Sequence, residues 1–447
     1  MAVGYTHVFT PTLTNELHFG LDHSDKNQRS VYGNTFGIPA QYGIAGIPQV
    51  ANNGGLPPIN INGLTHIGVG AYTPTLQTVY DIEVTDNVTK IYGSHQFKTG
   101  FQFDDLVGNI AQPPFGRGNF TFNGQYSDIP NKNSSLTGIA DLLLVPTVST
   151  VHGFDNLGGA QQYQGSNFAA TDDRRYYMGA YFQDDWKVTP TLTLNLGLRW
   201  DYFTPYAEVN GRQANLIQDG GNGSTGTFYI PKKGCSVPRS ATFDALLVSS
   251  GIQLNCVSGL GLGNAQKLNF APRVGFADQI LPRVVVRGGY GIAYGALGNL
   301  GYGGTLGTNY PFEYTISATS TSSQTPLALS NGATATMENT FATINLTDPT
   351  QVNGANVALY GRQYNFQTPY VQTYNLTAQY QFTNRDSIQT GYVGTVGRHL
   401  DNLGSHNSPS QILPPGVSQT PYLPFKKLRA NCYFFLDIDF RRLYTFG

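Results

Sequence analysis

The strongest constraint on this chain is an alternating run of residues between positions 176 and 202. From position 191 onward every second residue is apolar, namely Leu192, Leu194, Leu196, Leu198 and Trp200. Polar or small residues lie between them. Such alternation over about ten residues is typical of a β-strand with one apolar and one hydrated face. Residues 176–187 follow the same pattern, with Asp184 as the exception on the apolar side. A short turn containing Pro190 joins the two arms, so the segment is predicted to be a long β-hairpin.

Two environments produce such a hairpin. A tilted β-strand crosses a membrane with about 9–11 residues, and aromatic residues near its ends suit the two lipid–water interfaces. Trp186, Trp200 and Tyr202 hold such positions here. A soluble β-sandwich also alternates, although its strands are usually only about 5–6 residues long. The hairpin alone leaves both alternatives open.

Composition narrows the choice. Charged residues make up 12% of the 447 residues, about half the share usual in soluble proteins, and aromatic residues make up 13%. This balance favours a β-rich chain whose outer face meets lipid. The net charge of −1 gives no electrostatic case for nucleic acid. No apolar run is long enough for a transmembrane helix, but a barrel distributes its apolar residues over alternate positions.

Further hairpins follow the same pattern along the chain. In each hairpin a short turn joins two arms. The arms are residues 3–10 and the strand from 13, residues 77–90 and 95–105, residues 270–278 and 283–294, and residues 369–383 and 387–396. Loops of tens of residues connect one hairpin to the next, the longest at 24–72, 204–267 and 295–367. All the short turns therefore fall on one side and all the long loops on the other. Outer-membrane barrels have this asymmetry, with short periplasmic turns and long extracellular loops.

At these hairpins the chain resembles a known family. The segments YFQDDWKVTPTLTLNLGLRWDYFTP, LNFAPRVGFA, VVVRGGYGIAYG and TPYVQTYNLTAQYQF with GYVGTVGRHL are similar to the barrel of Oar-like TonB-dependent outer-membrane transporters of acidobacterial type. The resemblance implies an all-β, antiparallel transmembrane barrel of about 22 strands. It also implies a plug domain inside the barrel and energy from the inner-membrane TonB complex.

The chain departs from that pattern in its extent. It supplies about 10 to 12 of the expected strands, and we expect residues 1–415 to be part of the barrel. Residues 416–447 lose the alternation and form an atypical tail, which a truncation or a frame shift would explain. No signal peptide, plug domain or TonB box is recognisable in the sequence. We therefore expect a fragment of a transporter.

Several charged residues project from the face assigned to the barrel lumen: Lys187, Arg199, Asp201, Arg273 and Arg287. A polar interior suits a plug or a hydrated solute path, so these residues are candidates for plug contact or for lining the path. Substrate choice is expected in the long loops, since binding residues are frequent in loops held by a rigid scaffold.

Catalytic and cofactor signatures are not recognisable. Asp184 with Asp185, and Asp104 with Asp105, would suit glycoside hydrolysis only if both carboxylates faced one cleft, and neighbouring strand residues face opposite ways. The chain is therefore expected to be no enzyme and to need no cofactor or metal. Cys235 and Cys256 lie in one loop and can pair if the chain is exported, or can remain apart.

The function favoured by the sequence is that of a TonB-dependent receptor in the outer membrane of a Gram-negative bacterium. Its expected partners are outer-membrane lipid, the TonB complex reached through the missing plug region, and a large solute such as a carbohydrate, siderophore or peptide. The alternative is a secreted all-β adhesin or carbohydrate-binding protein without a transport role. A barrel would expose a continuous apolar outer face, whereas an adhesin would bury that face between two sheets.

Overall fold

The computed structural model consists mainly of long antiparallel strands. It describes residues 1–127, 138–144, 147–149, 153–156, 158–219, 225–295, 306–320, 325–329, 332–354, 357–405, 407, 409, 411–426, 428 and 432–438. An eleven-stranded sheet dominates, and its main path has ten strands. In sheet order these are β1 (Ala2–Thr10), β2 (Leu13–Gln28), β4 (Thr75–Tyr92), β5 (His95–Ala111), β10 (Thr171–Lys187), β11 (Leu192–Phe203), β17 (Asn269–Leu281), β18 (Val284–Tyr294), β22 (Tyr370–Gln381) and β23 (Ser387–Arg398).

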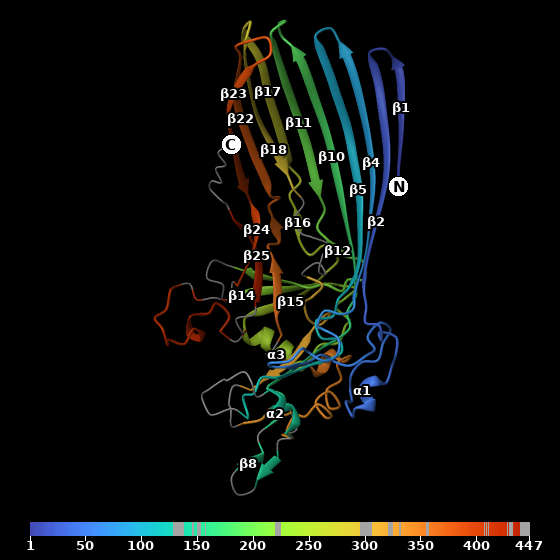
Figure 1. Cartoon of the computed structure of the whole chain (residues 1–447), viewed down its shortest axis with the longest axis vertical. Coiled ribbons are helices and arrows are strands. Elements are labelled where there is room, and N and C mark those ends of the chain that lie inside the picture. The colour runs from blue at the N-terminus through green and yellow to red at the C-terminus, as the bar shows by residue number, and fades with distance from the viewer. Residues whose placement is uncertain are drawn as a thin grey trace.

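Figure 1 shows these strands side by side as a curved wall, with every short turn at one end and the long connections gathered at the other. We call these the turn end and the loop end. All neighbours along the main path pair antiparallel. The all-β fold, the ten long strands and the sorting of connections by length confirm the predicted architecture. Among the described residues, no helix is both long and apolar enough to cross a membrane.

The apolar face of this sheet is open in the described structure. Large side chains that alternate with the polar ones remain about half exposed, with values of 53% for Phe182, 51% for Val274 and 54% for Leu376. A sandwich would cover such a face with a second sheet about 10 Å away. An apolar band of this extent instead matches the lipid-facing surface of a barrel, so the observation favours the membrane alternative over the adhesin.

Several strands extend further than the sequence pattern predicted. The loop expected from position 24 begins only after Gln28, because β2 continues to pair with β4 as far as Gln28 opposite Thr75. Similarly, β10 begins at Thr171 rather than near position 176. The turn expected at 279–282 is also shorter, since β17 continues to Leu281, which pairs with Val284. Beyond the lipid both faces of a strand meet water, so the sequence there no longer alternates.

The long connections pack into smaller structures at the loop end, which we call the loop layer. Its described residues form five minor sheets. The first comprises β3 (Ile59–Ile61), β6 (Asn119–Phe122), β9 (Gln162–Ser166) and β19 (Thr315–Thr319), and the second β13 (Asn215–Asp219), β14 (Thr225–Pro231) and β15 (Ile252–Val257). The others are β16 (Asn264–Ala265) with β21 (Asn365–Phe366); β20 (Leu359–Arg362) with β24 (Leu400–Ser405) and β25 (Cys432–Ile438); and β7 (Thr147–Ser149) with β8 (Gly153–Asn156). The short strand β12 (Ala207–Glu208) pairs with β10. The helices are α1 (Ile38–Gln41), α2 (Gly138–Leu143) and α3 (Ala241–Ser249), with 3-10 turns at Pro349–Gln351 and Thr420–Tyr422.

Two apolar cores hold the loop layer together. One is built around Phe228 and Phe243, and the other around Phe120 and Phe341, all of them at most 2% exposed. Ile316 in β19 packs against both cores and so links them. The long connections, whose sequences have no usable period, are therefore folded rather than extended loops.

A disulfide joins Cys235 to Cys256, whose Cα atoms are 6.2 Å apart, and resolves the alternative left open by the sequence. The bond ties the segment after β14 to β15, beside α3. Ser240 caps this helix, and its hydroxyl accepts a hydrogen bond of 3.2 Å from the Phe243 backbone N–H. A serine in this position satisfies a donor that the first helical turn cannot pair itself.

Candidate functional site

The polar face of the main sheet is continuous from strand to strand. Arg199 in β11 lies opposite Tyr181 in β10, Tyr181 lies opposite Gly100 in β5, and Gly100 lies opposite Asn87 in β4. On the other side Arg199 pairs with Ala271 in β17. Because directly opposed residues of a sheet share a face, this register places the polar positions of all these strands on one surface. We call this surface the polar face.

Arg199 and Asp201, two of the predicted residues, form the most closely connected group on the polar face. The Arg199 Nε donates to Asp201 Oδ1 over 2.8 Å, and its terminal nitrogen donates to Gln102 Oε1 over 3.0 Å. The Tyr177 hydroxyl donates to Asp201 Oδ1 over 2.6 Å and also contacts the guanidinium. The Asp201 side chain is only 6% exposed and that of Arg199 is 21% exposed. The carboxylate is thus held by charge and by hydrogen bonds from two strands.

The other three predicted residues do not join this group. Lys187, Arg273 and Arg287 are exposed, and none of them forms an ion pair with another residue that the structure describes. Arg273 lines an open cavity of about 370 Å³ on the polar face, together with Asn195 and Asn375. Contact of these five residues with a plug or a solute path stays a prediction.

Three further acidic residues on the same face, Asp22, Asp81 and Glu83, were not singled out from the sequence, and Asp104 was considered only as a catalytic pair with Asp105. Asp22, Asp81, Glu83 and Asp104 occupy the middle of β2, β4 and β5, with Glu83 opposite Asp104. The amide of Gln102 donates to both Glu83 (3.3 Å) and Asp104 (3.2 Å). Negative charge therefore gathers on these strands, and the arginines follow on β11, β17 and β18. Assigning alternate residues of every strand to the polar face would have revealed this separation of acidic and basic residues.

The adjacent aspartates separate across the sheet, as predicted. Asp185 lies on the polar face, where Asn195 donates to it over 2.6 Å and Lys98 over 3.2 Å. Asp184 lies on the apolar face near the turn end, 2.8 Å from His95 Nδ1. The His95 ring stacks on Trp186 at 5.1 Å. The two carboxylates cannot act on one substrate atom as a glycosidase pair requires. No cluster of three or more histidine, cysteine or acidic residues suited to a metal ion occurs within the described ranges.

The geometry defines the wall of an antiparallel membrane barrel, with one lipid-facing and one hydrated side. The chain belongs to the outer membrane beta barrel domain family, whose sequence profile matches residues 1–442. It is accordingly a protein of the outer membrane. No curated protein matches the chain.

Solved structures of an outer membrane transporter and of two receptors are similar to the chain. The outer membrane transporter YddB from Escherichia coli shares 10% identity with a TM-score of 0.42, over 97% of this chain and 36% of that one. The ferric-catecholate import receptor Fiu from E. coli K12 shares 11%, with a TM-score of 0.35, over 90% and 40%. The ferripyoverdine receptor of Pseudomonas aeruginosa shares 10%, with a TM-score of 0.38, over 97% and 36%. The chain thus spans about two fifths or less of the length of these three proteins.

Proposed function

We propose that this chain forms part of the wall of an Oar-like TonB-dependent receptor, which binds a large solute outside the cell and takes it up with energy from the inner membrane. The observation that carries the proposal is a polar wall with separated acidic and basic regions beneath a packed loop layer. The wall offers a hydrated surface to a plug or a passing solute, and the loop layer offers a rigid surface for capture. The solute would be a carbohydrate, a siderophore or a peptide.

The edges of the sheet support the view that this wall is part of a larger barrel. Within the described residues, β1 pairs only with β2, and β23 pairs only with β22. Each edge strand therefore has backbone N–H and C=O groups without a sheet partner. In lipid each such group costs several kcal/mol, about the cost of an unmade hydrogen bond in an apolar medium. We propose that further strands of the same receptor pair with β1 and β23 and close the barrel, of which residues 1–415 form a part.

Energy-dependent uptake tests this function. Cells with and without the gene are given labelled ferric siderophores, oligosaccharides and peptides, each before and after an uncoupler dissipates the proton gradient. We expect one class to enter only in cells that carry the gene and only while the gradient is present. Uptake that is independent of the gene, or equal after uncoupling, would contradict the proposal.

A pair of matched variants tests the role of the polar face. Arg273→Glu reverses a charge on the polar face, and Arg385→Glu reverses one in the turn between β22 and β23 at the opposite end from the loop layer. We expect the first variant to reduce uptake and the second to leave it unchanged, at equal amounts of protein in the outer membrane. Equal uptake by both variants would show that Arg273 contributes neither to the solute path nor to the plug contact.

A further inference from the structure

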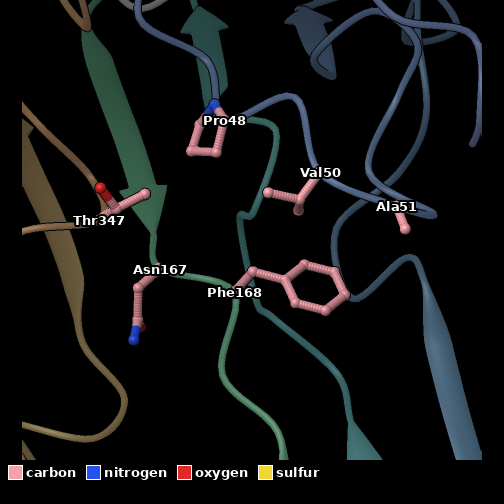
Figure 2. A pocket seen from close by; sticks show the side chains of 6 residues that line it. All are labelled: Pro48, Val50, Ala51, Asn167, Phe168 and Thr347. Carbon is pink, nitrogen blue, oxygen red and sulfur yellow. The ribbon is translucent and has the colours of Figure 1, made fainter.

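A cavity of about 320 Å³ lies in the loop layer, lined by Pro48, Val50, Ala51, Asn167, Phe168 and Thr347. These residues come from three separate connections: the one after β2, the one before β10 and the one after β18. Figure 2 shows the Phe168 ring and the Val50 side chain next to each other, with Pro48 above them and Thr347 across the cavity. The cavity therefore exists only because the three connections pack together.

The wall that carries Phe168 is fixed by the two residues that precede it, Ser166 and Asn167. The neighbouring Asn167 amide donates to the Phe312 carbonyl over 2.8 Å and accepts from the Tyr314 backbone N–H over 2.9 Å. One residue earlier, Ser166 and Phe115 exchange two hydrogen bonds of 3.0 Å. Phe168 thus projects from a segment held in place before any ligand arrives.

The opposite wall is fixed by Arg117 and Asn53. The buried guanidinium of Arg117 donates to backbone carbonyls at Asn52 (2.9 Å) and Gly54 (2.7 Å), and also to that of Thr73. Burial lowers the pKa of Arg117 to about 10, so it stays charged at neutral pH. Asn53 donates to the Pro48 carbonyl over 2.9 Å. These contacts hold the segment of Pro48, Val50 and Ala51 in one shape.

The chemistry of the lining is neutral and mainly apolar. None of the six lining residues is ionisable. The Asn167 amide is engaged with the backbone at 312–314, and the Thr347 hydroxyl donates to Asn345 Oδ1 over 2.7 Å. The lining has few hydrogen-bonding groups left for a ligand. A sugar or a charged group would therefore give up more hydrogen bonds with water than the cavity can replace. A closed apolar cavity of about 150 Å³ accepts benzene. This cavity has about twice that volume and is open to solvent at Val50, Ala51 and Thr347.

We infer that the cavity is a binding site for a neutral aromatic group of one or two rings, stacked against Phe168. The inference deepens the proposed receptor function and rests on it, because the site would select solutes that carry such a group. The site lies next to the start of β10, three residues before Thr171, and so adjoins the polar wall. Capture there would place the rest of the solute at the entrance to the barrel.

Photolabelling tests the site without depending on transport. The full chain in lipid nanodiscs is labelled with the neutral probe 3-trifluoromethyl-3-phenyldiazirine, and labelled peptides are mapped by mass spectrometry. The lipid-facing strands take up the probe from the bilayer and serve as an internal reference. Ala51→Trp fills the cavity, and Ala40→Trp adds the same bulk at an exposed position of α1 as the matched control. Phe168→Leu retains the bulk of an apolar side chain and removes the ring.

We expect label on the peptides containing Val50 and Phe168, reduced about tenfold by Ala51→Trp and unchanged by Ala40→Trp. Phe168→Leu should lower the label without shifting the reference peptides. Equal labelling of these peptides in Ala51→Trp and in the unaltered chain would overturn the inference, as would absence of label there while the strands are labelled. If the cavity is labelled but the protein transports none of the solutes, the binding site is upheld and only the receptor function is refuted.

Discussion

Replacement of Arg199 by methionine tests whether the ion pair on the polar face stabilises the wall. The substitution keeps an unbranched apolar stem and removes the guanidinium with its charge and donors. Asp201 would then retain only the Tyr177 hydroxyl as a donor on its Oδ1 atom, while its side chain is 6% exposed. The variant therefore leaves a largely buried carboxylate without its countercharge.

The size of the effect follows from burial. Two unit charges 4 Å apart attract by about 4 kcal/mol at the effective dielectric constant of a partly buried site. Removing one partner of a buried pair costs about 3–5 kcal/mol. Because Arg199 is 21% exposed and Tyr177 still donates to Asp201, we expect the lower limit, a loss of about 3 kcal/mol in the free energy of unfolding. Combined with Asp201→Asn, the cycle should give a coupling of about 2 kcal/mol.

Urea unfolding in lipid vesicles, followed by tryptophan fluorescence, measures this loss. The two tryptophans of the chain, Trp186 and Trp200, both lie in the β10–β11 hairpin, so the signal reports on the perturbed region. Arg273→Met is the control, since Arg273 is exposed on the same face, and its effect should stay within about 0.5 kcal/mol. An Arg199→Met effect no larger than the control, or strict additivity in the double mutant, would refute the reasoning.

Three further predictions concern the loop layer and are measured by hydrogen exchange of its peptides. Reduction of the bond between Cys235 and Cys256, which are 21 positions apart, should weaken protection of α3 by about 3 kcal/mol, and unchanged protection would contradict this. Burial raises the pKa of Glu313 from 4.5 to about 7, so the folded state binds its proton more tightly. Protection should be greatest below pH 4.5, decline by up to about 3 kcal/mol between pH 4.5 and 7, and stay level above pH 7. Glu313→Gln should abolish that decline, and a decline that persists in this variant would assign it to another group. Gly46→Ala places a Cβ atom 1.7 Å from a backbone oxygen at a φ of +80° and should cost more than Gly37→Ala, which has the same φ and open space around it; equal costs would show that the close contact relaxes freely.

The membrane-spanning part of the wall could be predicted because one face of the sheet meets lipid and the other meets water. Apolar and polar residues therefore alternate along each strand. Leu194, Leu196 and Leu198 face one way and Asn195 the other, since one face meets lipid and the other meets water. The same reasoning located Arg199 and Asp201 on one surface, although their contact with Tyr177 and Gln102 depends on pairing across strands. That pairing follows from register, which the sequence of one strand does not contain.

The loop layer could not be predicted for a physical reason. Its cores join residues far apart in the chain, such as Phe120 and Phe341, whose rings lie 5.5 Å apart. Ile316 links both cores from a short strand without any periodic neighbours. Short segments that are buried by several partners carry no period, so the sequence predicted only long loops between the hairpins. The cavity at Phe168 was missed for the same reason, because its walls come from three connections.

The register of the main sheet is regular along the body of each strand, and this limits the insertions and deletions that the gene can tolerate there. Deleting one codon within β10 would exchange the two faces beyond the deletion, turning Gln183 and Asp185 toward lipid and Phe182 toward water. Deleting two codons would restore the faces. In the described main sheet the irregularities of register lie beside short turns, at Val8 to Thr10 and at Asp278 to Leu281. Related genes should therefore gain or lose strand codons in pairs, and single codons only where the chain turns.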